Sequence, residues 1–577
     1  MNLSQEQIKA VLTDSKNALI LAGAGSGKTR VLVSRVNHLL ENCNVSPYEI
    51  MCATFTRKAG SEMTERLEKL AGSKSHNVTI GTLHSVALRM IQRFGEFIGL
   101  NPGKITVYSS WEEGFLLKDI CKELGYYNGK TFKQIKKTEI DEAFNLWYTR
   151  KQRNDRDQIV NEIMDAFFMR CRENNALTYG MIMTSFLDLL PRIGHLLNFK
   201  HILVDEVQDL DPLQWRIIRL ICAICHASLF AVGDDSQSIY GFRGADPEYL
   251  IRNQDKFDIY KLKDNYRSDG YIVEAANRLI RHNVNRLELE MNPIRKKENS
   301  YTIIPNMDSQ TIVDDLMKMP VDYNGNMAVL GRNHFLLEKL STLLTQSGID
   351  HDYIGKKTAF TRSENFRRVH SLLNIAVNPF DNFSFMLALD YFYISREQYK
   401  AIRMQAVRQN KSHFQVWTEN KHNGEMTEYI EAVRKESFLD VIEWMLGVDY
   451  GFECSDVFDF IDSYIESHHN PSIREYLDWL ALFDVQDEIS AEPKKLQLMT
   501  IHASKGLEFD MVIIAGMNEG ILPSYRANKD PKELESERRL AYVAYTRAKD
   551  FLILTSRPVD PEARMPCPPS RFIGESI

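Results

Sequence analysis

Short apolar runs alternate with amphipathic stretches near the start of the chain. The runs NALILA (17–22), MCATF (51–55) and VTIGTLHS (78–85) each have the length of a strand. They are separated by two segments with helical periodicity, KTRVLVSRVNHLL (28–40) and KAGSEMTERLEKL (58–70). Strands that alternate with helices in this way are typical of a parallel sheet.

The pattern changes after about residue 85, where long and charged helical periodicity continues to about residue 195 with few candidate strands. Strand-like runs then return at FKHILVDE (199–206), SLFAVGDD (228–235) and FDIYKLKDNY (257–266). We therefore interpret residues 86–195 as a helical insertion in a first core. The first core then comprises residues 1–85 and 196–258.

A second alternating region begins near residue 300. Its candidate strands are YTIIPN (301–306), NMAVLGRN (326–333), IDHDYIG (349–355), KLQLMTIH (495–502), MVIIAGMN (511–518) and DFLILTS (550–556). The helical segment 366–490 interrupts this region, so the second core comprises residues 259–365 and 491–577. The proline-rich end, 557–577, is expected to be loosely ordered. The predicted fold class is α/β, with two tandem cores of parallel sheet flanked by helices, each carrying a mainly helical insertion.

Composition narrows the class of protein. Because 577 residues exceed what one hydrophobic core normally holds, several domains are expected. There is no apolar run of about 18 residues, and the polar start MNLSQEQIKA lacks the apolar stretch of a signal peptide. We therefore expect a cytoplasmic protein without a membrane partner. The net charge of −7 argues against a chain coated in positive charge, although a local basic groove for nucleic acid remains compatible with it.

Cysteines give no sign of a metal or disulfide framework. Eight in a chain of this length are too few for a disulfide-stabilised scaffold. Cys222 and Cys225 form one C-x-x-C pair, but it lies in the apolar run IIRLICAIC, which favours thiols on a core helix. No second pair with metal-ligand spacing accompanies it.

The segment AGAGSGKT, from Ala22 to Thr29, fits the P-loop pattern except that Ala22 stands at the first glycine. Glycines allow the backbone N–H groups of such a loop to close around phosphate oxygens. Lys28 would reach the β- and γ-phosphates, and Thr29 would bind Mg²⁺. The predicted phosphate-binding residues are Ala22, Gly23, Ala24, Gly25, Ser26, Gly27, Lys28 and Thr29.

A second polar motif, HILVDEVQD (201–209), complements the P-loop. Asp205 and Glu206 follow apolar residues and so lie at the carboxyl end of a strand, where open α/β sheets bind ligands. Asp205 would share Mg²⁺ with Thr29, and Glu206 would polarise the attacking water. The predicted cofactors are therefore ATP and Mg²⁺.

Further motifs are spread over both cores. They are LSQEQIKAV (3–11), TFTRKAGSEM (54–63), GTLHS (81–85), VGDDSQSIYGFRGAD (232–246), NYRS (265–268), QLMTIHASKGLEFDMVII (497–514) and ERRLAYVAYTRAK (537–549). Together with the P-loop and the acidic pair, the chain resembles superfamily 1 DNA helicases of the UvrD, Rep and PcrA type. The resemblance covers both cores almost from end to end and implies two RecA-like P-loop NTPase cores that share one ATP.

The family's roles extend to matching positions in this chain. The resemblance implies that Gln7 contacts the adenine edge and that Arg30 and Tyr266 enclose the adenine ring. It implies further groups that face the phosphates or the nucleotide: Gln237, Arg243, Arg267, Arg547 and Glu508. Among these, Arg267 and Arg547 would be arginine fingers from the second core, and hydrolysis would open and close the two cores.

The same resemblance implies a channel for single-stranded DNA. Its expected lining is Phe55, Thr82, His84, Tyr240, Phe242, Arg332 and His502. At Phe242 the family usually has tryptophan, and the smaller ring of phenylalanine would weaken stacking on bases. The alternative for Tyr240 and Phe242 is packing in the core. Gly331 is a second departure, because the family commonly has tyrosine there.

The implied function is that of an ATP-dependent DNA helicase and single-stranded DNA translocase with 3′ to 5′ polarity. The polarity comes from the resemblance alone. The implied partners are single-stranded DNA and junctions between single- and double-stranded DNA. Two alternatives remain open at this point: a translocase that remodels protein–DNA complexes without processive unwinding, and a DNA-stimulated ATPase that acts as an effector subunit. The pathway (repair, replication or defence) also stays open.

Overall fold

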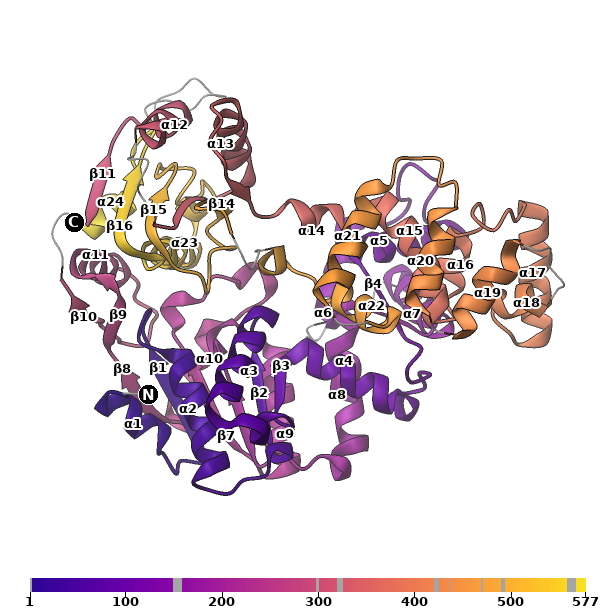
Figure 1. Ribbon diagram of the computed structural model, residues 1–577, viewed down its shortest axis with the longest axis horizontal. Coiled ribbons are helices and arrows are strands. Elements are labelled where there is room, and N and C mark those ends of the chain that lie inside the picture. Colours follow the sequence, from indigo (N-terminus) through magenta and orange to yellow (C-terminus); the bar gives the residue numbers. More distant parts are fainter. Residues whose placement is uncertain are drawn as a thin grey trace. The chain divides into compact units, whose positions relative to one another are not determined.

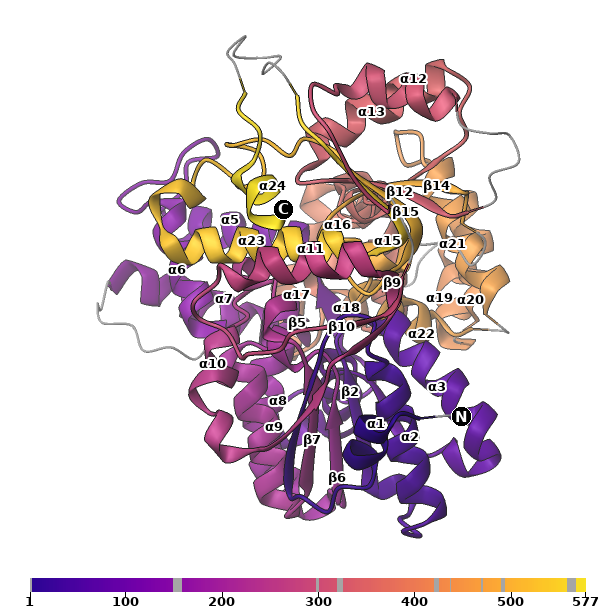
Figure 2. The same ribbon diagram turned by 90° about the vertical axis from the view of Figure 1, so that its left-hand side faces the viewer.

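The computed structural model describes residues 3–148, 158–296, 300–318, 325–419, 425–435, 437–468, 471–488, 493–557 and 567–577. The chain forms two compact units (Figures 1 and 2). The core unit comprises Met1–Leu83, His195–Lys356 and Val485–Ile577. The insertion unit comprises His84–Gly194 and Lys357–Asp484. Among the described residues, no helix is long and apolar enough to cross a membrane.

The first sheet of the core unit has six parallel strands in the order β3-β2-β6-β7-β1-β8. These strands are β1 (Asn17–Ala22), β2 (Ile50–Thr54), β3 (Thr79–Thr82), β6 (His201–Val204), β7 (Ser228–Gly233) and β8 (Asp258–Leu262). The central strands are buried along nearly their whole length, as expected for a parallel sheet covered on both faces. Because β8 pairs with β1, the first sheet continues past residue 258.

Helices flank this sheet and carry the functional loops. They are α1 (Gln5–Val11), α2 (Lys28–Glu41), α3 (Arg57–Ala71), α9 (Pro212–Cys225) and α10 (Pro247–Arg252). Helix α2 buries an apolar stripe that includes Val33 and Leu39, which belong to the same hydrophobic cluster as Ile20 of β1. Cys222 and Cys225 are half-buried on α9 and form no disulfide.

The second sheet also has six parallel strands, in the order β11-β16-β15-β12-β14-β13. These are β11 (Tyr301–Ile304), β12 (Met327–Gly331), β13 (Asp352–Tyr353), β14 (Leu496–Thr500), β15 (Phe509–Ile514) and β16 (Ala548–Thr555). Its helices are α11 (Gly270–Arg281), α12 (Ser309–Met317), α13 (His334–Gln346), α23 (Pro531–Tyr545) and α24 (Arg571–Ser576). A small parallel pair, β9 (Asp264–Asp269) and β10 (Asn292–Arg295), follows β8 in the chain. The predicted α/β class with two parallel sheets is confirmed.

The end of the chain differs from the expectation of loose order. Residues 558–566 lie outside the described residues, but Arg571–Ser576 form helix α24. Ser570 caps this helix, and the side chain of Phe572 is fully buried in the second core. The segment is rich in proline, and for this reason its sequence did not predict the short helix that packs on the second core.

The two helical insertions lie together in one compact unit. Their helices are α4 (Leu83–Phe94), α5 (Ser110–Glu123), α6 (Lys137–Tyr148), α7 (Gln158–Glu173), α8 (Tyr179–Ile193), α14 (Lys356–Phe360), α15 (Glu364–Val377), α16 (Asn382–Leu387), α17 (Arg396–Gln409), α18 (His413–Glu419), α19 (Glu425–Lys435), α20 (Phe438–Leu446), α21 (Ser455–Ser467) and α22 (Ile473–Ala481). Two short strands, β4 (Thr106–Tyr108) and β5 (Ala176–Thr178), pair within the first insertion.

Buried polar contacts join the two insertions. The hydroxyl of Tyr108 donates to Asp381 over 2.6 Å. The side-chain amide of Asn378 donates to the backbone carbonyl of Asn174 over 2.9 Å. Because buried polar groups are costly when unpaired, these contacts favour one packing of the two segments. The residue boundaries between cores and insertions stay a prediction.

Candidate active site

The P-loop connects β1 to α2 through a turn that needs glycine. Gly25 and Gly27 have φ angles of +67° and +85°, in the left-handed region. A Cβ atom on Gly25 would lie 2.7 Å from the Cβ atom of Arg267, which belongs to β9. Glycine at this position therefore permits both the turn and the close approach of the chain that begins the second core.

Other contacts hold the P-loop from both sides. Buried Gln7, from α1, donates its side-chain amide to the carbonyl of Ser26 over 2.9 Å. The hydroxyl of Ser26 donates to the carbonyl of Gly23 over 2.7 Å. The side chain of Asn265 donates to the carbonyl of Ala24 over 2.8 Å. The predicted phosphate-binding loop is thus braced by α1 and by β9. At the start of α2, Thr29 is half-buried and Arg30 is exposed.

The acidic pair follows β6, as its sequence predicts. Asp205 is buried, and one of its carboxylate oxygens accepts the backbone N–H of Glu206 over 2.9 Å. Glu206 has a φ angle of +48°, which is uncommon for a residue with a side chain and often marks a functional site. The ammonium group of Lys28 lies 3.4 Å from the carboxylate of Glu206. Lys28, Asp205 and Glu206 therefore share one small region beside the P-loop.

Burial and neighbouring charges shift the pKa values of the two acids in opposite directions. Burial, followed by the charge of Glu206, raises the pKa of Asp205. Burial works in the same direction on Glu206, but the positive charges of Lys28 and Lys505 outweigh it and lower the pKa of Glu206. Glu206 is therefore ionised at neutral pH.

Thr29 and Asp205 offer the hard oxygen donors that suit Mg²⁺, namely a hydroxyl and a carboxylate. The described residues contain no cluster of three or more acidic, histidine or cysteine side chains that could hold a metal by themselves. Mg²⁺ commonly uses only one or two protein ligands and completes its shell with water and substrate phosphates. The two oxygen donors of Thr29 and Asp205 match this coordination pattern.

Gln237 and Arg547 meet beside the acidic pair. The amide nitrogen of Gln237 donates to Asp234 over 2.7 Å, and its oxygen accepts from Arg547 over 3.3 Å. Arg547 is only 2% exposed and also donates to the carbonyls of Val543 and Leu507. Burial and the charge of Arg267 lower its pKa to about 9. The guanidinium group is thus held rigidly at the end of α23, pointing at the first core.

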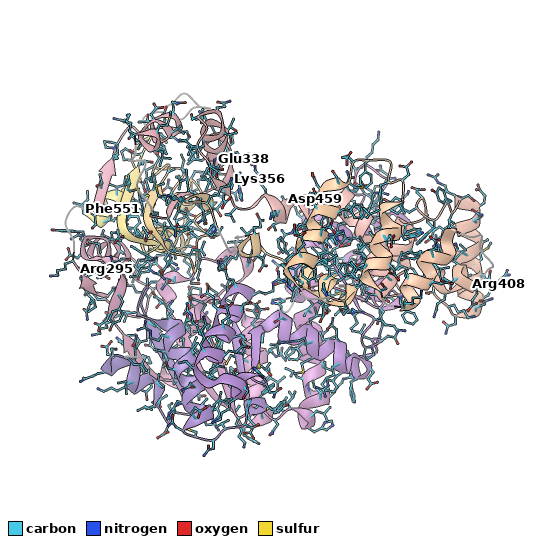
Figure 3. The ribbon with its side chains drawn as sticks, in the orientation of Figure 1. Arg295, Glu338, Lys356, Arg408, Asp459 and Phe551 are labelled. Carbon is cyan, nitrogen blue, oxygen red and sulfur yellow. The ribbon has the colours of Figure 1, made fainter. Side chains whose placement is uncertain are left out.

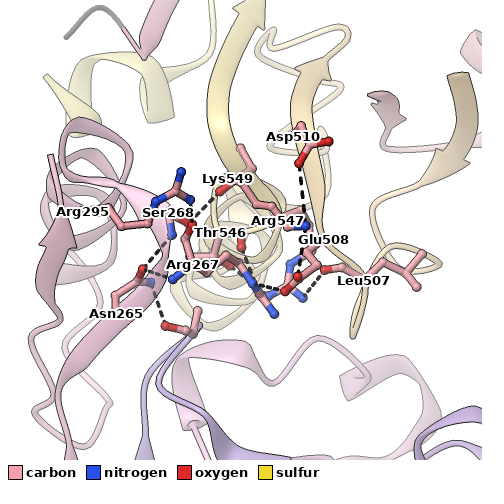
Figure 4. Close-up of polar contacts among 12 residues, drawn as sticks. Asn265, Arg267, Ser268, Arg295, Leu507, Glu508, Asp510, Thr546, Arg547 and Lys549 are labelled. Carbon is pink, nitrogen blue, oxygen red and sulfur yellow. Dashed lines mark hydrogen bonds and ion pairs between the residues drawn. The ribbon is translucent and has the colours of Figure 1, made fainter. Parts of the chain in front are cut away.

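Arg267 is the second arginine near the P-loop (Figure 4). It donates to Glu508 over 2.8 Å and to the carbonyl of Thr546 over 3.2 Å. Lys549 also contacts Glu508, over 3.2 Å. Burial alone would raise the pKa of Glu508, but Arg267 and Lys549 lower it. Glu508 thus orients Arg267 in this structure.

Tyr266, adjacent to Arg267, approaches the P-loop through its backbone. Its N–H donates to the carbonyl of Gly25 over 3.0 Å, while its side chain is exposed. Arg295, labelled in Figures 3 and 4, donates to the carbonyl of Arg267 and pairs with Asp550 over 2.5 Å. Arg295 therefore supports this segment on the side of the second core.

Arg243 lies beside the aromatic side chains of its own loop. Its guanidinium carbon is 5.2 Å from the ring centre of Tyr240 and 5.8 Å from that of Phe242. These distances are typical of cation–π contacts. Arg243 thus contacts the aromatic side chains of its loop, and its expected role toward the phosphates stays a prediction.

Tyr240 and Phe242 have opposite environments. Tyr240 is 5% exposed and stacks on Phe55, with ring centres 4.7 Å apart. Its hydroxyl donates to the carbonyl of His502 over 3.2 Å. Phe242 is 71% exposed, and its ring is perpendicular to the ring of His502, with ring centres 5.2 Å apart. The core-packing alternative therefore fits the buried Tyr240, while the ring of Phe242 is largely exposed to solvent.

The remaining residues of the expected DNA channel each have local contacts, and their role toward DNA stays a prediction. Arg332 donates to Glu537 through two nitrogens, at 2.8 and 3.1 Å. Burial lowers the pKa of His502 to about 3, so its imidazole is neutral. Thr82 ends β3 and is half-buried. His84 belongs to the insertion unit and stacks on Tyr179, with ring centres 4.3 Å apart.

Gly331 has a local explanation. A Cβ atom there would lie 3.0 Å from the side chain of Leu337 and 3.3 Å from the carbonyl of Asn333. The start of α13 thus packs directly on the end of β12. The larger side chain that the family commonly has would require this helix to shift.

Sequence reasoning missed three buried polar residues. The ammonium group of Lys505 binds the carboxylate of Asp209 and donates to the carbonyl of Gln237 over 2.6 Å. It also lies 5.3 Å from the ring centre of Tyr240. Gln208 donates to Glu206 over 2.5 Å and accepts from the backbone of Asp234 over 3.0 Å. The only available signal was their position inside the motifs HASKGLEFD and DEVQD, between residues with assigned roles.

Comparison with known proteins agrees with this arrangement. The sequence profile of the UvrD/REP helicase N-terminal domain matches residues 3–258. That of the UvrD-like helicase C-terminal domain matches residues 260–443 and 453–557. The ATP-dependent DNA helicase PcrA of Staphylococcus epidermidis (strain ATCC 35984) is 29% identical over 96% of this chain and 83% of its own length. The protein of the same name from Staphylococcus aureus (strain Mu50) is 29% identical over 100% of this chain and 86% of its own length. With the two profiles covering nearly all of its length, the chain belongs to the UvrD-like helicase family.

Proposed function

We propose that this protein is an ATP-dependent DNA helicase that translocates on single-stranded DNA from 3′ to 5′ and hydrolyses ATP between its two cores. One observation carries the proposal most directly. Arg547 and Asn265, from chain segments beyond the first sheet, contact Gln237 and Ala24 of the first core. A nucleotide at the P-loop would therefore contact residues of both cores. Its hydrolysis would then change the position of one core relative to the other.

The chemistry follows from the side chains around the P-loop. The backbone N–H groups of residues 23–27 and the ammonium group of Lys28 would bind the phosphates of ATP. Thr29 and Asp205 would hold Mg²⁺, which neutralises phosphate charge when bound. Glu206 would orient the attacking water and accept its proton.

The second core supplies the remaining positive charge. Arg267 and Arg547 would stabilise the charge that develops on the transferred phosphate, a contribution of about 10³–10⁵ in rate in comparable enzymes. Gln237 would contact the γ-phosphate, so that the conformation of its loop depends on whether this phosphate is present. Gln237 belongs to the first core, whereas Arg267 and Arg547 belong to the second. The rate of ATP hydrolysis would therefore depend on the distance between the cores.

The base and sugar of ATP would meet a separate set of groups. Gln7 would recognise the adenine edge, and Arg30 and Tyr266 would enclose its ring. Glu508 would contact the nucleotide from the second core. The exposed side chains of Arg30 and Tyr266 are available for this role.

Single-stranded DNA would bind on the aromatic side of the same loop. Phe242 offers an exposed ring on which bases can stack without regard to sequence, and Arg243 adds a positive charge beside it. Phe55 and Tyr240 would hold this platform from below. The set Thr82, His84, Arg332 and His502 would extend the contact with the strand, up to junctions with double-stranded DNA.

Strand displacement tests the proposal. Three duplexes of the same sequence would carry a 3′ tail, a 5′ tail or no tail, and displacement would be followed with ATP and Mg²⁺ present. We expect the 3′-tailed duplex to be opened and the other two to remain closed. Glu206→Gln, which keeps the size of the side chain, is the matched inactive control.

Each other result has a definite meaning. Opening of the 5′-tailed duplex alone would contradict the polarity. ATP hydrolysis stimulated by single strands, without displacement of any duplex, would favour a translocase or effector subunit that does not unwind. Absence of DNA-stimulated hydrolysis would contradict the proposed function altogether.

A further inference from the structure

Lys505 is a buried lysine in the loop that joins β14 to β15 of the second core (Figure 1). Only 3% of the residue is exposed, which is uncommon for a lysine. Gly506 follows with a φ angle of +86°, so the backbone turns directly after Lys505. The backbone of Lys505 is therefore held in the second core by the two strands, whereas its side chain contacts the first core.

The ammonium group of Lys505 contacts two loops of the first core. It binds the carboxylate of Asp209 and donates to the carbonyl of Gln237 over 2.6 Å. Asp209 lies three residues after Glu206, and its backbone N–H donates to the Glu206 carbonyl over 2.9 Å. The other carboxylate oxygen of Asp209 has no hydrogen-bond partner among the described residues. Lys505 is therefore the countercharge of Asp209, and it holds the segment that contains Glu206.

The same ammonium group lies beside two aromatic rings of the expected DNA channel. Its nitrogen is 5.3 Å from the ring centre of Tyr240 and 5.9 Å from that of Phe55, both within the range of cation–π contacts. These two stacked residues are called the aromatic pair below. The hydroxyl of Tyr240 also donates to the carbonyl of His502, three residues before Lys505. One short loop of the second core therefore contacts the acidic segment, the loop of Gln237 and the aromatic pair.

Two simpler roles do not fit these contacts. Lys505 is too deeply buried to bind a phosphate of DNA, and its hydrogen bonds are directed to protein groups. A role in stability alone also explains little, because apolar side chains of similar volume often stabilise a protein as well as a buried ion pair does. The contacts of Lys505 instead favour a role in placing three functional segments relative to one another.

We propose that Lys505 is a positioning residue that couples the binding of single-stranded DNA to ATP hydrolysis. Its ammonium group holds the segment of Glu206, the loop of Gln237 and the aromatic pair in one arrangement. Phe242 adjoins the aromatic pair, with its ring centre 6.0 Å from that of Tyr240. A base that stacks on Phe242 therefore favours the positions of Glu206 and Gln237 that hydrolysis requires. This role rests on the proposed function and adds the residue that links its two sites.

Lys505→Met keeps the length of the side chain but removes its charge and its hydrogen bonds. Steady-state ATPase rates, measured with and without a saturating oligothymidine, give the factor by which DNA stimulates hydrolysis. We expect this factor to fall by roughly tenfold or more, because a charge-assisted hydrogen bond is lost. KM for ATP should change by less than about threefold, since a positioning residue acts on the rate rather than on ground-state binding. Affinity for the oligothymidine, from fluorescence anisotropy, should likewise stay near normal.

A paired variant separates positioning from folding. Lys505→Met leaves the carboxylate of Asp209 buried without a countercharge, and such a charge destabilises a protein. Lys505→Met combined with Asp209→Asn removes both charges, so its thermal unfolding temperature should be close to that of the unmodified protein. Its DNA stimulation should nevertheless remain low. Recovery of both stability and stimulation would overturn the proposal, because Lys505 would then serve folding alone. Should Lys505→Met fail to fold, the paired variant decides.

Lys339→Met is the matched control, since Lys339 is an exposed lysine on α13 of the second core. Its DNA stimulation should equal that of the unmodified protein. A Lys505→Met variant that kept its stimulation, or that lost affinity for ATP or DNA instead, would overturn this role and leave the proposed function intact. Hydrolysis that DNA does not stimulate in the unmodified protein would contradict the proposed function and this role together.

Discussion

Arg547 donates a hydrogen bond to the side chain of Gln237 over 3.3 Å, although 310 residues separate the two along the chain. Arg547 follows α23 in the second core, and Gln237 follows β7 in the first. The contact joins the cores beside Asp205 and Glu206. Because Arg547 is buried and makes several further hydrogen bonds, it cannot follow Gln237 if the cores separate. The hydrogen bond between Arg547 and Gln237 therefore depends on the relative position of the two cores.

Arg547→Ala should lower ATP turnover strongly while changing ATP affinity much less. The reason is that an arginine finger acts on the charge of the transition state, where it contributes about 10³–10⁵ in rate. Steady-state ATPase rates with single-stranded DNA, compared with nucleotide affinity at equilibrium, measure the two effects separately.

Arg526→Ala serves as the control for this experiment, because Arg526 is exposed and contacts Tyr525 rather than the first core. Its turnover should remain normal. A variant of Arg547 that lost ATP affinity but kept its maximal rate would assign that arginine to binding instead of catalysis.

Glu206→Gln should bind ATP and DNA but hydrolyse ATP slowly. The amide keeps the shape of the side chain and cannot accept a proton, and general-base catalysis contributes about 10²–10⁴ in rate. Single-turnover hydrolysis with prebound ATP isolates this step. Glu41→Gln, at the exposed end of α2, should behave as the unmodified protein. Near-normal hydrolysis by Glu206→Gln would remove Glu206 from the proposed mechanism.

Much of the fold could be predicted from local patterns, since short buried strands and amphipathic helices have distinct periods. The P-loop and the acidic pair follow β1 and β6, so their motifs predicted where those strands end. The union of the two insertions could not be predicted, because it depends on pairs such as Tyr108 and Asp381, which lie 273 residues apart. Single side chains of this kind leave no periodic signal.

The candidate site shows the same division. The P-loop could be predicted from Gly25 and Gly27, because both have φ angles that glycine favours. The cation–π contacts of Arg243 could not be predicted from the sequence, since they depend on how the rings of Tyr240 and Phe242 lie in three dimensions. Lys505 and Asp209 were missed because burial of an ion pair between two cores requires the cores to be placed.

His370 makes the insertion unit sensitive to acid. It is fully buried between the carbonyl of Phe366 and the hydroxyl of Tyr476, and burial lowers its pKa to about 3. The unfolded chain, with a pKa near 6.5, binds one more proton between these values. The free energy of unfolding should therefore fall by about 1.4 kcal/mol for each pH unit between about 6.5 and about 3, and should not change from this cause above that range.

His370→Phe should reduce this loss. Urea-unfolding midpoints of the full chain, measured at pH 6.5 and 5.0, should differ less in the variant than in the unmodified protein. His195→Asn, at an exposed position, should keep the original difference. Equal acid sensitivity of the unmodified protein and His370→Phe would mean that other groups cause it.

Phe242 and Tyr240 provide a last, paired prediction, because the two rings are adjacent but differ in exposure. Phe242→Ala removes an exposed ring, so stability and ATP affinity should stay near normal. Base stacking contributes about 1–3 kcal/mol per base, so affinity for single strands should fall. Fewer base pairs should then be opened for each ATP consumed, because the strand slips.

Tyr240→Ala should act in the opposite way, since it removes a buried ring that packs on Phe55 and lies near Lys505. Truncation of a buried aromatic costs about 3–5 kcal/mol, so this variant should lose stability first. Thermal unfolding, DNA affinity and the ratio of base pairs opened to ATP consumed separate the two effects. Phe242→Trp should raise the ratio above that of the unmodified protein, because the larger ring offers more stacking surface. If Phe242→Ala instead unfolds the chain or leaves the ratio unchanged, the exposed ring has no part in holding the strand, and the loop between Gln237 and Phe242 does not link ATP to DNA.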